Sequence, residues 1–397
     1  MARAGEIGEV QPVDSADVIV VGGGVVGCAA AFELARDVDV LVLESDAIAG
    51  GATGKASGLV SPVYDHRANL DAARYATAFF RSFDGTRNLT FTERPGVFCF
   101  AADERTHAVE ASRVAADAGF DTAILDPDGL EREFPGVFNT GPFDGAAVFH
   151  DTGWVDSYTF ATALQKEAED RGATVETGVT VESVTTVNGE VSGVTTTEGR
   201  YEAGTVVAAA GWRTRSLLAE HLRIPVRPFR YQTATLEIER ALDAAYPMAW
   251  EHGTRLYWRP TRSGSLHVGG QPYFVETPGS VRQSATDAFT RLVATAIPEY
   301  LCDLGEPRLQ GTDTCKTGAA ATPDTLPIID EPPAGPDGLV LATGMHGFGI
   351  MLAPVAGAGV RSLVTGAEVP FPLDPYRLGR FDDRSESFGS AYIQSAP

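Results

Sequence analysis

Residues 17–44 read DVIVVGGGVVGCAAAFELARDVDVLVLE, and this stretch decides the fold. It begins with a short run of β-branched residues, 17–21, which is typical of a buried strand. Residues 25–36 then carry apolar side chains on nearly every side, the pattern of a helix buried inside a larger protein. A second apolar run, 38–43, has the length of another buried strand. The stretch therefore predicts one β-α-β unit.

Three glycines and one acidic residue indicate a ligand for this unit. Gly22, Gly24 and Gly27 follow the first strand. The first makes a tight turn, the second lets the backbone approach a pyrophosphate, and the third lets the helix pack on the strand. The helix N-terminus then offers free N–H groups and a positive dipole end to the phosphates. Glu44 ends the second strand and can accept both hydroxyl hydrogens of an adenosine ribose. The unit predicts dinucleotide binding, although it does not separate NAD from FAD.

The chain is strongly acidic, with 31 Lys and Arg against 53 Asp and Glu and a net charge of −22. Because a charge of this sign opposes phosphate binding, we expect no nucleic-acid partner. The acidic, lysine-poor composition suits a salt-rich, halophilic cytoplasm, where screening limits charge interactions to roughly 3 Å at 1 M salt.

The sequence predicts neither a membrane span nor a signal peptide. No apolar run reaches the roughly 18 residues that a span requires, and residues 1–14 are polar. We therefore expect a soluble, cytoplasmic protein, whose oligomeric state the sequence leaves open. Cys28, Cys99, Cys302 and Cys315 show no CxxC spacing, and no histidine completes a metal cluster. We expect neither a metal site nor disulfides.

The loop after the β-α-β unit distinguishes the two dinucleotides. Residues 51–59 (GATGKASGL) resemble the flavin loop of the D-amino-acid oxidase superfamily, which includes glycine oxidase, sarcosine oxidase and D-arginine dehydrogenase. Residues 206–212 (VVAAAGW), 319–329 (AAATPDTLPII) and 342–354 (ATGMHGFGIMLAP) are similar to further motifs of this family. The motifs follow the family's order, and the resemblance covers residues 17–383.

The resemblance implies an α/β fold, in which a Rossmann-type FAD-binding domain carries a mixed β-sheet substrate domain that caps the flavin. Helices and parallel-type strands fall in three separate parts of the chain, so we expect both domains to be discontinuous. The expected boundaries are 15–92, 150–225 and 321–370 for the FAD-binding domain, 93–149 and 226–320 for the substrate domain, and 371–397 for a polar tail.

The resemblance also implies which residues bind FAD. The cysteine that holds flavin covalently in monomeric sarcosine oxidase aligns with Thr317, two residues from Cys315, so we expect non-covalent FAD. Lys55 and Lys316 lie in flavin motifs, and we expect Lys55 to approach the flavin. The expected FAD-binding residues are Gly22, Gly24, Val25, Val26, Gly27, Glu44, Ser45, Gly51, Ala52, Thr53, Gly54, Lys55, Ala56, Ser57, Gly58, Leu59, Val181, Ala209, Ala210, Gly211, Trp212, Gly344, His346, Gly347, Phe348, Gly349, Ile350 and Met351.

The chemistry implied by the resemblance is amine oxidation. A hydride moves from the α-carbon of an amine or amino acid to flavin N5, and the resulting imine hydrolyses. Reduction leaves negative charge near flavin N1, which a helix N-terminus at residues 347–351 would stabilise with backbone N–H groups. Two alternatives stay open: oxidation of a 2-hydroxy acid or another alcohol, and a flavin-binding subunit without turnover of its own. The electron acceptor is not identified.

The residues that usually bind a substrate carboxylate in this family are missing. An arginine of the family is Ala319 here, a second arginine of glycine oxidase is Gly347, and a lysine of sarcosine oxidase is Met351. Burying a carboxylate without a cationic partner is costly. Either another arginine takes over, or the substrate is not a simple α-amino acid.

Five residues are the candidates for catalysis and substrate binding. Tyr257 matches an active-site tyrosine of D-arginine dehydrogenase-like enzymes, and Arg259 faces the same way because side chains alternate along a strand. Arg230 is a second candidate for the carboxylate. His267 stands where sarcosine oxidase has its oxygen-activating lysine and would do similar work when protonated. His346 is expected near the isoalloxazine. For Arg259, Arg230 and His267, a purely structural role is the alternative.

Overall fold

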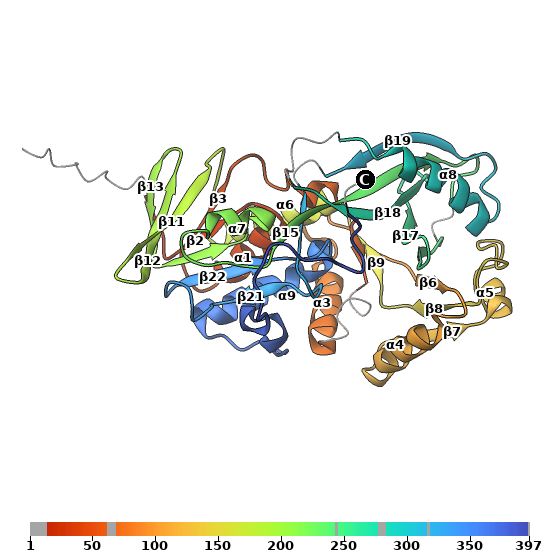
Figure 1. The fold of residues 1–397 in the computed structure, drawn as a ribbon, viewed down its shortest axis with the longest axis horizontal. Helices are drawn as coiled ribbons and strands as arrows, with labels where there is room; N and C mark the ends of the chain where they lie inside the picture. The colour runs from red at the N-terminus through yellow and green to blue at the C-terminus, as the bar shows by residue number, and fades with distance from the viewer. Residues whose placement is uncertain (1–13, 62–68, 243–244, 277–282, 316–317, 396–397) are drawn as a thin grey trace, which may run out of the picture.

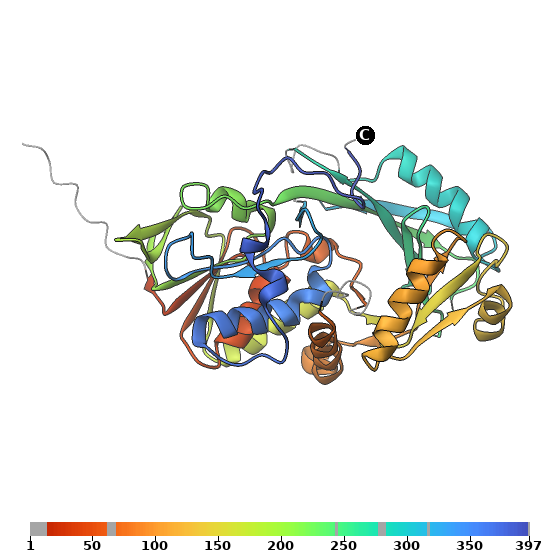
Figure 2. The same cartoon turned by 60° about the horizontal axis from the view of Figure 1, so that its bottom comes forward.

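The computed structural model has two large sheets at opposite ends of an elongated molecule, with helices packed on both (Figure 1). Figure 2 shows the same two halves from another side. The structure describes residues 14–61, 69–242, 245–276, 283–315 and 318–395.

The described elements follow each other along the chain in this order: β1 (Asp14–Ser15), β2 (Val18–Val21), α1 (Val25–Leu34), β3 (Val40–Glu44), η1 (Thr53–Lys55), β4 (Leu59–Val60), α3 (Leu70–Phe83), η2 (Thr86–Asn88), β5 (Thr92–Glu93), β6 (Gly96–Phe100), α4 (Arg105–Asp117), β7 (Thr122–Leu125), α5 (Pro127–Glu133), β8 (Gly145–Phe149), β9 (Gly153–Trp154), α6 (Ser157–Asp170), β10 (Thr174–Thr177), β11 (Val181–Val187), β12 (Glu190–Thr196), β13 (Gly199–Glu202), β14 (Thr205–Ala208), η3 (Gly211–Arg213), α7 (Thr214–Leu217), β15 (Arg227–Glu237), β16 (Met248–Glu251), β17 (Leu256–Pro260), β18 (Leu266–Phe274), α8 (Asp287–Tyr300), β19 (Arg308–Thr314), β20 (Ala319–Ala321), β21 (Ile328–Asp330), β22 (Leu339–Thr343), α9 (Gly349–Thr365), η4 (Asp374–Tyr376) and η5 (Leu378–Arg380).

The first sheet has six strands and begins with the predicted β-α-β unit. Its order is β10-β3-β2-β14-β22-β21, and all neighbours pair in parallel except β21 with β22. All of α1 is buried, which explains why its sequence is apolar on nearly every side. A parallel sheet that starts with a glycine-rich strand–helix turn is the Rossmann-type arrangement predicted from the sequence.

Helices and a smaller sheet cover the two faces of this first sheet. Helix α1 contacts both α6 and α9 on one face. The four-stranded sheet β1-β13-β12-β11 packs on the other face, where Ile19 of β2 and Val194 of β12 belong to one core cluster. The hairpin β11–β12 turns at Asn188 and Gly189, which both have positive φ as a two-residue hairpin turn requires.

The second sheet is mixed, with the order β19-β15-β18-β17-β16-β6-β8-β7 and with β20 paired to β15. One face of this sheet forms a core around Trp258, to which Phe289 and Val293 of α8 contribute. Helix α4 covers the far end of the opposite face, where Ala115 packs in a cluster with Phe149. The rest of that opposite face lines the cavity described below.

The predicted fold class is confirmed, but two parts of the chain differ from the sequence-based picture. Helix α8 was not predicted, although Thr286 caps it by accepting the N–H of Phe289. The expected polar tail over 371–397 packs on the fold over its described part, since Leu378 and Ile393 are buried. No helix within the described ranges combines the length and apolar character that crossing a membrane requires.

We expect Gly27→Ala to lower the free energy of unfolding by about 1–3 kcal/mol, the usual cost of overpacking. A Cβ atom on Gly27 would overlap the carbonyl oxygen of Gly22. Chemical denaturation of the variant and the wild type measures the difference. Gly204→Ala is the matched control, because a Cβ atom there has no neighbour within 4 Å. Equal losses in the two variants would contradict the close packing at Gly27.

Candidate functional site

A cavity of about 1150 Å³ lies between the two large sheets. Its walls come from the β2–α1 turn, the loop 50–59, the N-terminal end of α9 and one face of the mixed sheet. Pockets for ordinary small molecules measure roughly 300–1,000 Å³. This cavity is therefore large enough for a ligand of unusual length.

The β2–α1 turn shapes one end of the cavity as an anion cradle. Helix α1 begins after Gly24 without a side-chain cap from that residue, although the N–H of Val25 donates to Oγ1 of Thr53 at 3.0 Å. Gly22 has a φ of +111°, and a Cβ atom there would lie 2.7 Å from the carbonyl oxygen of Ala209. The tight turn and the uncapped helix end suit a pyrophosphate, which fits the ADP part of FAD.

Glu44 stands beside this cradle in a fixed orientation. Its Oε2 accepts the N–H of Gly23 at 2.6 Å, and its Oε1 accepts the N–H of Asp46 at 2.9 Å. A carboxylate oxygen has more than one acceptor site, so Glu44 can still accept hydroxyl groups of a ribose. Glu44 also lines the cavity, as the ribose interaction predicted from the sequence requires.

The residues expected to bind FAD line this cavity, with three exceptions: Gly27, Gly54 and His346. Gly27 packs α1 against the turn, which is the role that the motif gives to its third glycine. The N–H of Gly54 donates to the carbonyl of Ala49, so this residue shapes the loop from behind. The binding roles of the remaining residues stay predictions, although their positions around one cavity agree with them.

Helix α9 presents a second uncapped N-terminus to the cavity. Phe348 precedes the helix without a side-chain hydrogen bond, and Gly349, Ile350 and Met351 of the first turn line the cavity. The first N–H groups of a helix lack partners within the helix, and the dipole places positive charge there. This end of the cavity can therefore stabilise negative charge on a ligand.

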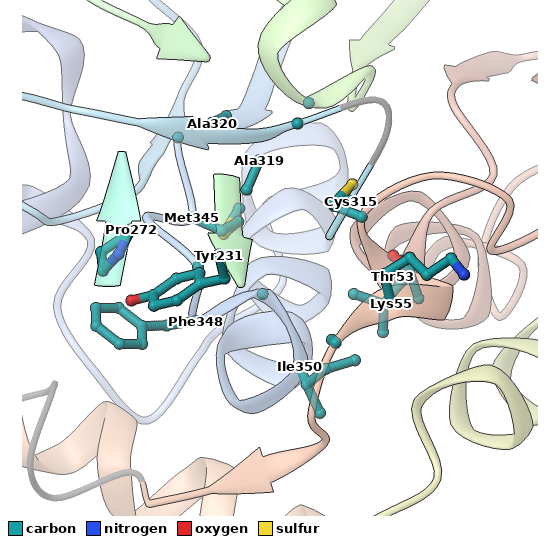
Figure 3. Close-up of a pocket in the computed structure, with 18 of the residues that line it drawn as sticks. Thr53, Lys55, Tyr231, Pro272, Cys315, Ala319, Ala320, Met345, Phe348 and Ile350 are labelled. Atoms are coloured by element: carbon teal, nitrogen blue, oxygen red, sulfur yellow. The ribbon is translucent and has the colours of Figure 1, made fainter. Parts of the chain in front are cut away.

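Tyr231 occupies the space in which a side chain at position 347 would begin. Gly347 has a φ of +87°, and a Cβ atom there would overlap the Tyr231 ring. Figure 3 shows Tyr231 and Phe348 on one side of the pocket, with Lys55 and Cys315 on the other. An arginine at position 347 would therefore have to displace Tyr231, and this chain has an aromatic wall instead.

Ser57 connects the loop 50–59 to the mixed sheet. Its Oγ lies 2.9 Å from the hydroxyl of Tyr257 and 2.9 Å from Nε2 of His267. Its carbonyl oxygen accepts Nε–H of Arg259 at 2.7 Å, and that guanidinium lies 4.3 Å from the ring centroid of Trp154. Of these five residues, Ser57 and Tyr257 line the cavity.

Burial determines the protonation states in this network. It raises the pKa of Tyr257 in spite of the hydrogen bond to Ser57 and the charge of Arg259, so the hydroxyl stays protonated at neutral pH. It lowers the pKa of Arg259 to about 10, which leaves the guanidinium charged. Burial and the nearby Arg259 charge lower the pKa of His267 to about 3. His267 is therefore neutral at pH 7, and the protonated form considered from the sequence is not supported.

Arg259, His267, Arg230 and His346 do not line the cavity, unlike Tyr257. Arg259 and His267 lie behind Ser57, which uses their polar groups in its own hydrogen bonds. Arg230 is completely buried, whereas its neighbour Tyr231 lines the cavity. Consecutive side chains of a strand point to opposite faces, so β15 directs Arg230 away from the cavity.

His346 is also directed away from the cavity. The chain passes through it with a φ of +49°, and its ring lies 5.6 Å from the Phe229 ring, with Nδ1 facing the N–H of Thr322 at 3.4 Å. The side chain is 1% exposed, and burial lowers its pKa to about 4. The backbone of this motif lines the cavity at Gly344 and Gly347, but the expected contact of His346 with the isoalloxazine is not supported.

Lys55 makes an ion pair across the cavity wall. Its Nζ lies 2.6 Å from Oδ2 of Asp313 on β19, and both side chains are 41% exposed. Cys315, close to this pair in sequence, is buried and lines the cavity. Lys316 and Thr317, which the sequence analysis also considered, lie outside the described residues.

Several cavity residues on the mixed sheet, in its β16–β17 turn and in the C-terminal segment were not predicted. Tyr231, Phe98, Trp250, Arg255 and Tyr392 all line the cavity. Arg255 lies in the turn before β17 and has a φ of +57°, so the alternation of side chains along a strand does not extend to it. Its Nη1 donates to the carbonyl of Tyr392 at 3.2 Å. The other positions depend on which strands pair and where the C-terminal segment packs, and no local pattern reveals this.

Comparisons with known proteins agree with these features. The family model described as FAD dependent oxidoreductase (DAO) matches residues 17–363. Glycine oxidase of Pseudomonas putida is 28% identical over 383 residues, which cover 92% of this chain and 100% of that protein. The bifunctional protein ThiO/ThiG of Synechocystis is 26% identical over 379 residues, which cover 92% of this chain. This chain spans 54% of the length of that bifunctional relative.

The fold has a close counterpart among solved structures. L-Proline dehydrogenase from P. horikoshii superposes with a TM-score of 0.84 at 24% sequence identity. The superposition covers 94% of this chain and 99% of that structure. The shared fold therefore includes both the six-stranded sheet and the mixed sheet that together enclose the cavity.

We expect Lys55→Met to weaken FAD binding about tenfold. The variant removes a cation from the cavity wall and leaves the Asp313 carboxylate without its partner. This carboxylate would then repel the negatively charged cofactor. Titration of apoprotein with FAD, followed by quenching of flavin fluorescence, measures the dissociation constant. Lys166→Met is the matched control, because Lys166 pairs with Glu169 on the exposed surface of α6. Equal dissociation constants for FAD in the two variants would contradict the predicted role of Lys55.

We expect His346 to make the protein less stable in acid. Its folded pKa of about 4 lies below the ordinary value of 6.5, so the unfolded chain takes up a proton first as the pH falls. The stability due to neutral His346 is present above pH 6.5 and is lost towards pH 4. Urea unfolding from pH 7 to 4 should show His346→Asn losing up to about 3 kcal/mol less than the wild type. Parallel curves for the two proteins would contradict this assignment.

Proposed function

The chain belongs to the DAO family of FAD-dependent oxidoreductases, and we propose that it oxidises an amine or amino acid at the carbon next to nitrogen. FAD would be held without a covalent bond. One observation carries the proposal: a single cavity runs from Glu44 and the glycine turn to a wall formed by Tyr231 and Tyr257. A ligand of the length of FAD can then meet a second, smaller molecule within the same cavity.

The cofactor and the chain have separate tasks in this proposal. When bound, FAD would supply the acceptor for a hydride from the C–H bond beside the amine nitrogen, and the imine product would hydrolyse in water. The N-terminus of α9 supports this reaction, because its N–H groups at Gly349 and Ile350 face the cavity and favour negative charge. The N-terminus of α1 favours the pyrophosphate charge in the same way at the other end.

Tyr257 is the polar group best placed to orient the substrate. Its hydroxyl is protonated at neutral pH and lies 2.9 Å from Oγ of Ser57. Its ring lies over Gly269, where a Cβ atom would overlap the Tyr257 ring and hydroxyl. The sheet therefore supports the Tyr257 ring, Ser57 fixes its hydroxyl, and the residue lines the cavity.

Arg255 is our candidate for binding a substrate carboxylate. Among the described lysines and arginines of the cavity wall, Lys55 is paired with Asp313, and Arg213 lies over the ring of Trp212 on the Rossmann side. Arg255 instead lies in the turn between β16 and β17, two residues before Tyr257, and its Nη1 donates to a backbone carbonyl. Its remaining N–H groups can form a two-point contact with a carboxylate.

The relatives favour amines over 2-hydroxy acids as substrates. Glycine oxidase and L-proline dehydrogenase are named for the oxidation of amino acids, and their similarity covers at least nine-tenths of this chain. The test is anaerobic mixing of the holoprotein with amines, amino acids and 2-hydroxy acids, while the yellow flavin absorbance is recorded. We expect bleaching by an amine or amino acid. Bleaching by hydroxy acids alone, or by none of these compounds, would overturn the proposal. Acid precipitation should release free flavin if the linkage is non-covalent.

We expect Arg255→Leu to raise the apparent dissociation constant of an amino-acid substrate about 10- to 100-fold, the range of one or two charge-assisted hydrogen bonds. The dissociation constant comes from the dependence of the anaerobic bleaching rate on substrate concentration. Arg291→Leu removes the same charge from an exposed position of α8 and serves as control. The dissociation constant of an amine without a carboxylate should be the same in both variants. If the two variants change the dissociation constant of the amino acid by a similar factor, Arg255 is excluded as its carboxylate partner.

A further inference from the structure

One row of side chains crosses the mixed sheet from the Rossmann side to its far edge. The row follows the strand register, in which each member is the direct partner of the next on the neighbouring strand. Its members are Asp313, Thr233, Gly269, Tyr257, Trp250, Phe98 and Ala147. All of them except Gly269 line the cavity, and Gly269 lies under the Tyr257 ring.

Beyond Tyr257 this row becomes aromatic. The rings of Trp250 and Phe98 are stacked, with centroids 4.3 Å apart and planes at 4°. Phe149 meets the edge of Phe98 at 5.3 Å and 89°. Trp250 is the direct cross-strand partner of Tyr257 on β16, whereas the Tyr257 hydroxyl leans the other way, over Gly269 of β18, so the stacked rings begin beside the backbone of Tyr257.

Helix α4 provides the opposite wall. Ala108 and Ala111 line the cavity, and one turn further along Ala115 belongs to the core cluster of Phe98 and Phe149. We call the space bounded by Phe98, Phe149, Trp250, Ala108 and Ala111 the aromatic lane.

Charged and titratable residues adjoin the lane where β6 and β16 end, next to the turn that carries Arg255. Glu104 and His107 of the α4 region and His252 line the cavity there, and the Glu104 carboxylate contacts Nδ1 of His252. A substrate carboxylate would gain little in this place, because the acidic group there is negative as well. An apolar, planar group would bury its surface against three aromatic rings and two methyl groups.

We propose that the aromatic lane is the subsite for the substrate side chain, and that the substrate is an amino acid or amine with an aromatic side chain. The inference rests on the proposed function and names its substrate class. The reacting carbon lies next to Tyr257, the polar end faces Arg255, and the aromatic group lies along Trp250 and Phe98. The side chains that α4 presents to the cavity here, Ala108 and Ala111, are small.

The experiment compares glycine, alanine, leucine and phenylalanine in the anaerobic bleaching assay, each amino acid other than glycine in both enantiomers. We expect one enantiomer of phenylalanine to have an apparent dissociation constant at least about tenfold below that of glycine. Ala111→Phe fills the lane and should remove this preference, with glycine little affected. Ala116→Phe makes the same change on the exposed side of α4 and should leave the preference intact.

A second variant protects the test against a folding defect in the first. Trp250→Leu keeps an apolar side chain but loses the stacked ring. It should raise the apparent dissociation constant of phenylalanine about tenfold relative to that of glycine. If glycine binds as tightly as phenylalanine, or if Ala111→Phe and Trp250→Leu both leave their ratio unchanged, the lane is not the side-chain subsite. If variants in the lane alter only flavin reoxidation, the lane serves the electron acceptor, and the proposal is overturned. If no amine bleaches the flavin, the failure is that of the proposed function itself.

Discussion

The close packing around helix α1 is the constraint on which the cavity depends. At its start, Gly27 packs so tightly on the turn that a Cβ atom would overlap the Gly22 carbonyl. On its side, α9 packs against it at Gly357, where a Cβ atom would lie 2.6 Å from the carbonyl oxygen of Ala29. This second contact fixes the position of α9 along α1, with Gly349 beside Val25. Two helix N-termini therefore point into one cavity, which suits a cofactor with phosphates at one end and a charge-accepting ring at the other.

The loop 50–59 joins this frame to the mixed sheet. Thr53 accepts the N–H of Val25 at the start of α1, and four residues later Ser57 contacts Tyr257, His267 and Arg259 on the sheet. The loop thus fixes the distance between the pyrophosphate cradle and the substrate wall. Nε2 of His267 and Nε–H of Arg259 bond to Ser57, and neither side chain lines the cavity, which argues against a role for them as substrate ligands.

How much could be predicted depended on whether a residue's position follows from its own neighbours in the sequence. The β-α-β unit, the glycine turn and Glu44 are local, because one strand, one turn and one helix determine them, and the structure has them where they were predicted. The direction of Arg230 depends on the register of β15 with β18, where the pairing shifts between positions 230 and 232. The neutral state of His267 depends on burial by segments far away in sequence. Neither could be read from the strand that carries the residue.

In the proposed function, different residues of the mixed sheet contact different parts of the substrate. A chain without the usual carboxylate ligands would then still select its substrate. Position 347 is a glycine, and the ring of Tyr231 occupies the space beside it, so selectivity at this point comes from shape instead of charge. Tyr257, Trp250 and Phe98, which are partners on neighbouring strands, continue this uncharged aromatic wall. A pair of stacked rings on a rigid sheet loses little conformational freedom on binding, unlike a long arginine side chain. If the proposed subsite is right, the selectivity for a substrate on this sheet comes mainly from apolar contact, and the few polar groups set its orientation.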